Sequence, residues 1–305
     1  VALLFLLCLP VAFIYNESPL PFIWPSLISA TMATFLFVVT KNASVKKITS
    51  REGFLSVSLS WMLLATMGTL PFIFSGSVNS FVDAFFESAS GFTTTGSTIF
   101  NNLEILPHTI LFWRSLTHWV GGLGIILFVI IILPSLKITA QQLFSMESSL
   151  KEKIMPKTKA IGLRLLFIYL GLTIIQIVLL NLGDMNLFDS ICHAFSTVAT
   201  GGFSTKNTSL SAFSAYSQYI VALFMFLSGV SFVIYYYLIK FNFRKILNNE
   251  ELWFYAAVTI ISGLIVSGIL STKTSKSLET AFRHGFFQVI SIITTTGFIT
   301  DDYLY

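Results

Sequence analysis

The sequence has 305 residues and a net charge of +4. Of these residues, 54% are hydrophobic and 10% are charged, and the mean hydropathy is +0.81. Soluble domains carry roughly 25% charged residues, so this composition excludes an ordinary soluble domain and indicates an all-α polytopic membrane protein.

Apolar stretches follow one another along the chain. About 20 such residues cross the hydrocarbon core of a bilayer. Candidate spans lie at 1–15, 22–40, 54–74, 109–134, 163–182, 216–239 and 252–270. The first is short and resembles the core of a signal peptide, but it lacks a basic leader and a second apolar span follows at once. We therefore expect two transmembrane helices within residues 1–40.

Basic residues gather in alternate loops between these spans. Three loops contain most of the 18 Lys and Arg residues: Lys41, Lys46, Lys47 and Arg51; Lys137, Lys151, Lys153, Lys157, Lys159 and Arg164; and Lys240, Arg244 and Lys245. Cytoplasmic loops of membrane proteins are rich in Lys and Arg, so these loops are expected in the cytoplasm. No basic stripe remains elsewhere, which argues against a nucleic-acid partner.

One short pattern occurs three times in the sequence. The segments SGFTTTGSTI (90–99), STVATGGFST (196–205) and SIITTTGFIT (291–300) align without gaps. A short amphipathic stretch precedes each copy, and a full apolar span precedes that stretch. Non-helical backbone is tolerated at membrane depth only where it is buried or lines a water-filled cavity. The repeat is therefore predicted to be a span, a short helix, a re-entrant Thr/Gly loop entering from outside, and a second span.

The Thr/Gly loops have the chemistry of a cation filter. Extended segments of this kind can point successive backbone carbonyls in one direction, and rings of such oxygens replace the hydration shell of a cation. Glycine adopts the positive φ that aims neighbouring carbonyls inward, where a Cβ would cost roughly 1–2 kcal/mol. The short helix ends at the loop, and the partial negative charge of a helix C-terminus favours a cation. A single loop of this type is common, so the prediction rests on the repetition.

These segments also resemble a known family. FESASGFTTTGST, HAFSTVATGGFSTKN and FQVISIITTTGFITDDY resemble successive pore loops of the Trk/Ktr/HKT superfamily of cation transporters, in particular of the bacterial TrkH/KtrB membrane subunits. FWRSLTHWVGGLGIILF (112–128) resembles the helix after the first of those loops. The resemblance covers essentially the whole chain. It implies four repeats in a pseudo-fourfold arrangement around one potassium pathway, three of whose pore loops are present here.

The resemblance implies a division of the chain and a set of ion contacts. Two N-terminal helices would occupy 1–40, and pore repeats would occupy 53–134, 161–240 and, incompletely, 252–305. Three residues of each loop would contact the ion: Thr94, Thr95 and Gly96; Thr200, Gly201 and Gly202; and Thr295, Thr296 and Gly297. Potassium would be the transported ion, and no organic cofactor is expected.

The resemblance further implies the partners and the location of the protein. These are a homodimer, a cytoplasmic nucleotide-binding regulatory subunit of the TrkA/KtrA kind, and the bacterial inner (plasma) membrane. The polar loop at 135–164 is expected either to dock that subunit or to be a solvated linker. Three loops cannot close a fourfold ring, so the sequence is expected to be a fragment of a chain that contains a fourth.

Other transport functions stay open at this point. One glycine per loop indicates few ordered carbonyl rings and weak discrimination among cations, although glycine in all three loops favours potassium over the sodium-conducting relatives. Flux is either passive or coupled to sodium or protons. A secondary transporter of a small organic solute is the alternative, but its repeats would usually be inverted. An enzyme is not expected, because the sequence lacks a nucleophile–base pair or an H-E-x-x-H motif.

Charged residues near the loops are expected to support them. Arg114 lies within an apolar span, where ionisable residues are usually paired, and its candidate partners are Asp83 and Glu87. Asp83 and Asp189 hold equivalent places at the start of short helices, where a carboxylate can cap free N–H groups. His284 takes that place in the third repeat.

The remaining candidates point to no transition-metal site. The four histidines have no metal-ligand spacing: His108, His118, His193 and His284. Cys8 and Cys192 both lie in apolar surroundings, so packing is their expected role. Arg283 is expected to pair with Glu279, four residues earlier on the same short helix.

Overall fold

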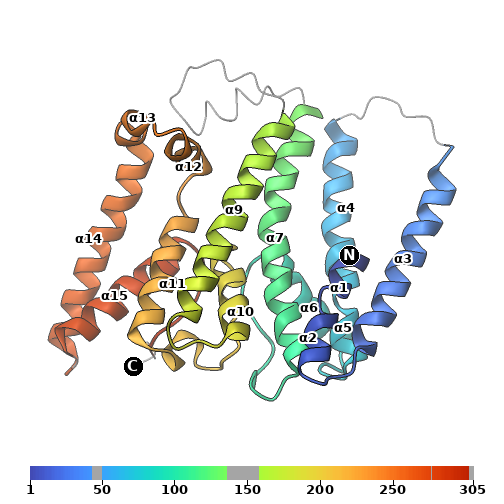
Figure 1. The fold of residues 1–305 in the computed structure, drawn as a ribbon, viewed down its shortest axis with the longest axis horizontal. Helices are drawn as coiled ribbons and strands as arrows, with labels where there is room; N and C mark the ends of the chain where they lie inside the picture. Colours follow the sequence, from blue (N-terminus) through green and yellow to red (C-terminus); the bar gives the residue numbers. More distant parts are fainter. Residues whose placement is uncertain (43–49, 136–157, 276, 302–305) are drawn as a thin grey trace. The chain divides into compact units, whose positions relative to one another are not determined.

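The computed structural model describes residues 1–42, 50–135, 158–275 and 277–301 (Figure 1). Within these residues every regular element is helical. The chain divides into two compact units, Val1–Phe92 with Leu106–Leu166, and Thr93–Ile105 with Phe167–Tyr305. All three Thr/Gly loops therefore belong to the second unit, whereas the short helix before the first loop belongs to the first.

The first unit is a helical bundle (Figure 1). Its helices are α1 (Ala2–Leu6), α2 (Leu9–Ile14), α3 (Leu20–Thr40), α4 (Ser50–Gly68), α5 (Leu70–Phe74), α6 (Phe81–Phe92) and α7 (His108–Ser135). The N-terminal span expected over 1–15 forms two short helices instead. Pro10 explains the break, because proline in the first turn of α2 has no N–H with which to continue α1.

The short helix α6 packs against both α4 and α7. Gly68 at the end of α4 faces Ser88 and Phe92 of α6. A Cβ on Gly121 of α7 would lie 2.1 Å from the carbonyl oxygen of Phe92, so only glycine permits this approach. Ser88 also donates its hydroxyl to Ala65 O at 2.7 Å. These contacts fix the end of α6, from which the first Thr/Gly loop emerges.

Glu17, between α2 and α3, caps the N-terminus of α7. Its carboxylate accepts hydrogen bonds from the backbone N–H groups of His108 (2.7 Å) and Thr109 (3.0 Å) and from the Thr109 hydroxyl (2.7 Å). Partial burial alone would raise the pKa of Glu17. The hydrogen bonds from Thr109 and His108 outweigh this effect and hold that pKa below its ordinary value.

Glu17→Gln is expected to lower the melting temperature at neutral pH, because the loss of a helix cap costs about 1 kcal/mol. A carboxylate with a depressed pKa stabilises the fold above its unfolded pKa, and this stabilisation is lost as the pH falls through the folded value. The difference between wild type and variant should therefore narrow once the pH drops below 4.5. Thermal melts in detergent across this range check the prediction, and a difference independent of pH would contradict it.

The second unit contains the remaining helices. They are most of α9 (Thr158–Asn181), α10 (Leu187–Val198), the 3-10 turn η1 (Ser209–Ala212), α11 (Ala215–Ser228), α12 (Phe232–Ile239), α13 (Phe243–Leu247), α14 (Glu250–Lys273) and α15 (Leu278–Ile293). The short helix α15 packs along α14 and against α11. Leu180, Met225, Phe287 and Phe298 are fully or almost fully buried in the core that joins α9, α11, α15 and the third loop.

The apolar span expected over 216–239 is broken in the structure. Helix α11 ends at Ser228 and α12 begins at Phe232. Tyr255 of α14 donates its hydroxyl to Phe226 O at 3.1 Å, and Tyr235 of α12 donates its own to Leu227 O. These hydroxyls satisfy carbonyls that an uninterrupted helix would have bonded, which makes the break tolerable in apolar surroundings. The sequence prediction of one continuous span was therefore wrong.

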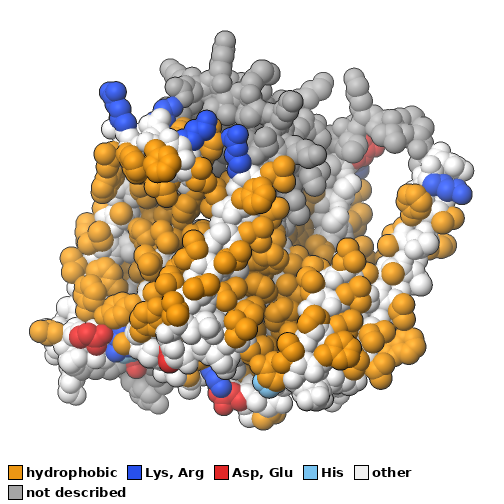
Figure 2. All heavy atoms as spheres, viewed as in Figure 1, with side chains coloured by type: hydrophobic (Ala, Val, Ile, Leu, Met, Phe, Trp, Pro, Cys, Tyr) orange, Lys and Arg blue, Asp and Glu red, His pale blue; other side chains and the backbone are white. Residues whose placement is uncertain are grey.

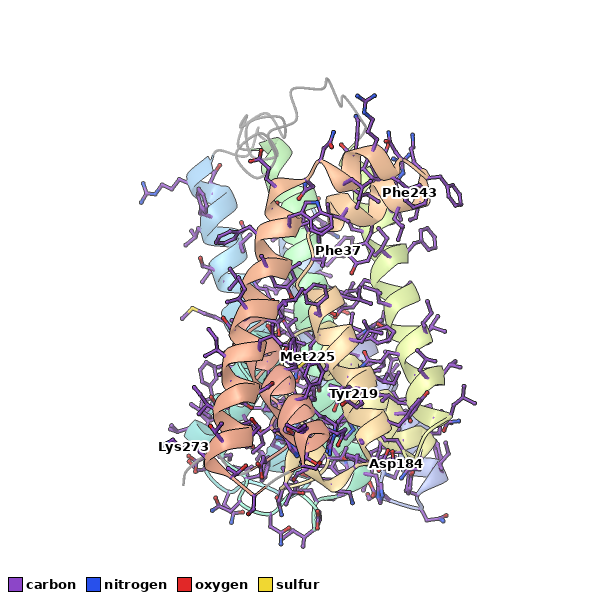
Figure 3. All side chains as sticks on the ribbon, turned by 90° about the vertical axis from the view of Figure 1, so that its left-hand side faces the viewer. Phe37, Asp184, Tyr219, Met225, Phe243 and Lys273 are labelled. Carbon is purple, nitrogen blue, oxygen red and sulfur yellow. The ribbon has the colours of Figure 1, made fainter. Side chains whose placement is uncertain are left out.

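Among the residues that the structure describes, four helical segments are long and apolar enough to cross a membrane: Leu20–Thr40, Arg51–Phe74, Leu163–Asn181 and Glu250–Lys273. Hydrophobic side chains cover the outer face of α14, and Lys and Arg gather at the end that carries α12 and α13 (Figure 2). Figure 3 places Phe243 of α13 at one end of the second unit and Asp184 and Lys273 at the other. The unit thus has an apolar middle between two polar ends.

Candidate ion-binding site

Three short helices, α6, α10 and α15, each end directly at a Thr/Gly loop. Each begins with a side-chain cap: Ser80 accepts from the N–H of Asp83, Asn186 from that of Asp189, and Ser277 from that of Thr280. The helices α6 and α10 have 12 residues and α15 has 16, so the third is about one turn longer.

The expected capping role of Asp83 and Asp189 is corrected by these bonds. Both residues lie in the first turn, three positions after the true cap. In α10 the N-cap is Asn186, whose side-chain oxygen accepts from Asp189 N at 2.8 Å. Asp83 is exposed, whereas the buried carboxylate of Asp189 reaches toward the chain beyond the second loop.

The backbone of the three loops follows one repeated conformation. Positive φ angles occur at the threonine two positions before each glycine and at the glycine itself: Thr94 (54°), Gly96 (78°), Thr200 (53°), Gly202 (83°), Thr295 (59°) and Gly297 (83°). Glycine adopts such angles freely, but a β-branched residue there is strained. The same strain at three equivalent threonines marks a functional constraint, since it persists only where the surroundings impose it.

Hydrogen bonds to the preceding helix hold this conformation. Gly201 donates its N–H to Ser196 O at 2.8 Å, and Thr296 donates its own to Ser291 O at 2.9 Å. The hydroxyls of Thr93 and Thr95 lie 2.7 Å apart, and those of Thr294 and Thr296 lie 2.8 Å apart. These bonds engage N–H groups and hydroxyls of the loops, and backbone carbonyl oxygens are the acceptors that a cation would need.

The loops touch one another through their glycines. A Cβ on Gly96 would lie 2.0 Å from the carbonyl oxygen of Gly201, and one on Gly202 would lie 2.0 Å from that of Thr296. A Cβ on Gly297 would meet nothing within 4 Å. The loops are thus arranged in chain order. The carbonyl of Gly201 in the second loop lies against Gly96 of the first, and the carbonyl of Thr296 in the third loop lies against Gly202 of the second.

Segments that follow the loops are joined in the same order. Asn207, after the second loop, accepts from Leu103 N at 2.7 Å and donates to the Asn102 side chain at 3.2 Å. Leu210 donates its N–H to Ile299 O at 3.0 Å, beyond the third loop. The second loop therefore lies between the first and the third.

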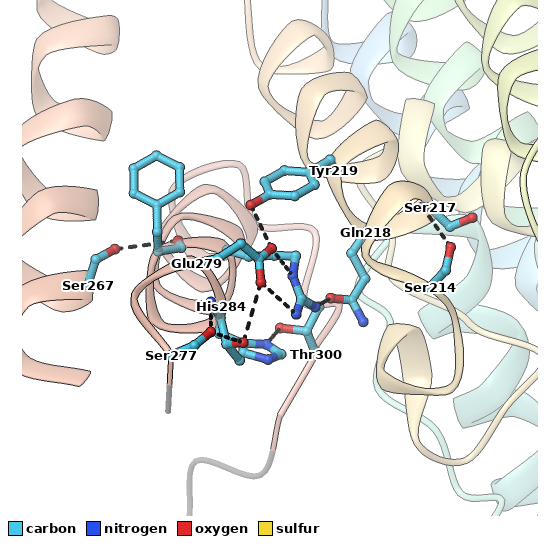
Figure 4. A network of polar contacts seen from close by, with 12 residues as sticks. Ser214, Ser217, Gln218, Tyr219, Ser267, Ser277, Glu279, His284 and Thr300 are labelled. Carbon is cyan, nitrogen blue, oxygen red and sulfur yellow. Dashed lines mark hydrogen bonds and ion pairs between the residues drawn. The ribbon is translucent and has the colours of Figure 1, made fainter. Parts of the chain in front are cut away.

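Two ion pairs lie beside the short helices. Arg114 of α7 is 2.7 Å from Glu87 of α6, and both side chains are almost fully buried, with 1% and 0% exposed. On α15, Arg283 is 2.9 Å from Glu279 and also bonds the Gln218 side chain (Figure 4). Of the two partners that the sequence offered Arg114, the structure pairs it with Glu87.

Together these features define a polytopic helical membrane protein built on repeated units of a short helix and a Thr/Gly loop. The sequence profile of the TrkH family, described as cation transport protein, matches residues 24–304. The chain belongs to this family of cation transport proteins.

Known relatives agree with this assignment. The chain is 39% identical over 262 residues to the Trk system potassium uptake protein TrkH of Salmonella typhimurium, covering 84% of this chain and 54% of that protein. It is 32% identical over 276 residues to the Trk system potassium uptake protein TrkI of Halomonas elongata, covering 89% and 55%. The chain spans about half the length of the curated relatives it matches.

A solved structure has the same fold. The crystal structure of the potassium transporter TrkH from Vibrio parahaemolyticus superimposes with a TM-score of 0.85 at 31% sequence identity. The match covers 98% of this chain and 63% of that one. The fold predicted from the sequence, an all-α membrane protein of the TrkH kind, is therefore confirmed.

Proposed function

We propose that this chain forms most of the ion pathway of a potassium uptake protein. The three Thr/Gly loops would form three sides of a ring whose carbonyl oxygens replace the hydration shell of K⁺. The observation that carries this proposal is the contact of glycine with carbonyl from loop to loop, combined with the repeated positive φ angles. The open position beside Gly297 is where a fourth loop would complete the ring.

In this proposal the residues that contact the ion are those predicted from the sequence. They are Thr94, Thr95 and Gly96; Thr200, Gly201 and Gly202; and Thr295, Thr296 and Gly297. Each set contains one residue of positive φ before the glycine and the glycine itself, so each loop would present the same geometry to the ion. The repeat boundaries at 53–134, 161–240 and 252–305 are part of the same proposal.

Uptake of rubidium, a potassium surrogate, tests the function. The protein encoded by the complete reading frame would be reconstituted in proteoliposomes, and rubidium uptake measured against increasing potassium or sodium. Competition by potassium at lower concentration than by sodium supports the proposal. Equal competition favours a sodium-conducting relative, and no uptake by folded protein sends the search to small organic solutes.

We also propose an orientation in the bacterial inner membrane, with the end that carries α12 and α13 in the cytoplasm. This end exposes Lys240 and Arg244, and cytoplasmic loops are rich in such residues. Basic residues of the other two predicted cytoplasmic loops lie largely at 43–49 and 136–157, outside the described residues.

Cysteine labelling checks the orientation. Cys8 and Cys192 are buried, so the background reaction is expected to be low. Lys273→Cys should react with a membrane-impermeant maleimide in intact cells, whereas Arg244→Cys should react only after permeabilisation. The reverse pattern would contradict the proposed orientation.

We also propose partners for this chain. The relatives are named as parts of a Trk system, which supports a complex of several components. A homodimer and a cytoplasmic nucleotide-binding regulatory subunit are the proposed components. Residues 136–157 of the 135–164 loop that would dock this subunit lie outside the described residues, and residues 158–164 belong to α9. Copurification of the regulatory subunit with the intact protein, and its loss when the loop is deleted, would support this role. Copurification that survives the deletion would contradict it.

A further inference from the structure

The chain that follows the second and third loops is bonded back to the helix that precedes each loop. The Thr205 hydroxyl donates to Asp189 Oδ1 at 2.6 Å. Thr300 Oγ1 and His284 Nδ1 lie 2.7 Å apart in the same arrangement (Figure 4). The two pairs are equivalent, since each helix residue and each threonine stands at the same distance in sequence from its loop glycine.

Both bonds are shielded from water. All four side chains are buried: Asp189, Thr205, His284 and Thr300. The second carboxylate oxygen of Asp189 accepts from Asn186 at 2.9 Å, so the carboxylate itself is fixed in orientation. In such surroundings the removal of one partner leaves the other desolvated without a hydrogen bond, which makes the pair costly to break.

The second loop carries one more bond of this kind. His193 Nε2 lies 2.9 Å from Ser204 Oγ, and the same Oγ accepts from Lys206 N at 3.0 Å. His193 is fully buried, and its Nδ1 lies 2.8 Å from Asp189 O. The chain leaving the second loop is thus held at two successive residues.

The first loop is built differently. The residues equivalent to Asp189 and Thr205 are Asp83 and Ile99. Isoleucine has no hydroxyl to donate, and Asp83 is exposed. Instead, Glu87, the equivalent of His193, pairs with Arg114 of α7. The bond from helix to returning chain is therefore a property of the second and third loops.

We propose that the Asp189–Thr205 and His284–Thr300 bonds are positioning bonds that set the width of the ion ring and hence its preference for potassium over sodium. This inference rests on the proposed function. A strained threonine stays at positive φ only if its surroundings over-determine it, and each bond anchors the chain three residues beyond the loop glycine. A loosened anchor lets the ring contract around the smaller ion.

Thr205→Val tests the inference, because valine has the shape of threonine without its hydroxyl. The measurement is the ratio of potassium to sodium needed to halve rubidium uptake in proteoliposomes. We expect Thr205→Val to reduce this selectivity by roughly three- to tenfold, the effect of one buried hydrogen bond. Thr205→Ser keeps the hydroxyl and should restore the wild-type ratio. Thr208→Val, at an exposed threonine of the same segment, should leave it unchanged.

The outcomes separate this inference from the function on which it rests. If the wild-type protein takes up no rubidium, the proposed function fails before any variant is compared. If wild type is selective and folded Thr205→Val and Thr300→Val retain its selectivity, the positioning role is overturned. If Thr205→Val fails to fold, Thr300→Val is the deciding variant. A Thr300→Val protein that is less stable but keeps the wild-type selectivity ratio would also contradict the inference.

Discussion

Replacing Gly202 by alanine is expected to reduce rubidium uptake more than tenfold while the protein still reaches the membrane. The added Cβ would stand 2.0 Å from Thr296 O, and that oxygen is backbone, which cannot move aside without moving the third loop. The φ of 83° adds roughly 1–2 kcal/mol of strain for a residue with a Cβ. A tenfold loss of uptake corresponds to about 1.4 kcal/mol, and we expect the displacement of the third loop, rather than the backbone strain, to cause it.

A matched control separates the clash from the strain. Gly76, in the loop between α5 and α6, has a φ of 70° but no atom within 4 Å of an added Cβ. Gly76→Ala should therefore incur similar backbone strain and leave uptake near the wild-type rate. Equal losses of uptake in Gly76→Ala and Gly202→Ala would show that the contact between loops is not what uptake depends on.

The second large effect is expected from the buried ion pair of the first unit. Arg114→Met leaves Glu87 buried with its charge uncompensated, which costs roughly 3–5 kcal/mol. For a chain of this size we expect the melting temperature in detergent to fall by roughly 10 °C. The double variant Arg114→Met, Glu87→Met removes both charges and should recover most of the loss, since apolar replacement of a whole buried pair is often neutral.

The exposed pair on α15 provides the comparison. Glu279 is 54% exposed, so Glu279→Gln should change stability by no more than about 1 kcal/mol. If Arg114→Met were as mild as Glu279→Gln, the pair would not brace α6 as the burial indicates. A double variant no more stable than Arg114→Met would show that Arg114 acts through contacts other than the pair.

Periodicity and repetition made the architecture predictable from the sequence. The three loops were found because a membrane tolerates non-helical backbone only in special places, and a repeated Thr/Gly segment after a short amphipathic stretch marks such a place. The positive φ of the loop glycines was expected from their lack of a Cβ. That Arg114 is paired was expected from the rule that a charge within an apolar span has a partner, whereas the choice of Glu87 over Asp83 comes from the structure.

Other features depend on contacts that sequence spacing does not encode. The strained Thr94, Thr200 and Thr295 could not be foreseen, since nothing local favours a positive φ at threonine. The role of Asp189 was misjudged, because a carboxylate in the first turn of a helix usually serves that turn, whereas Thr205 is its partner here. The sequence did contain a signal for this partner. The second and third copies have a threonine, Thr205 and Thr300, at the position where the first copy has Ile99, which cannot donate a side-chain hydrogen bond.

The break between α11 and α12, at Ser228–Ser231, is another feature that the local sequence does not encode. Its apolar composition predicts a continuous helix. The break is stabilised by the hydroxyls of Tyr235 and Tyr255, the second of which comes from α14. Tertiary hydrogen bonds thus override the local preference of the chain.

A rubidium-bound crystal structure of the protein encoded by the complete reading frame tests the central claim most directly. Anomalous scattering at the rubidium absorption edge locates the ion without reference to the protein. The account predicts rubidium at the centre of the loops, coordinated by backbone oxygens that include those of Gly201 and Thr296. Rubidium bound elsewhere in a protein whose loops keep their conformation, with none at those oxygens, would contradict it.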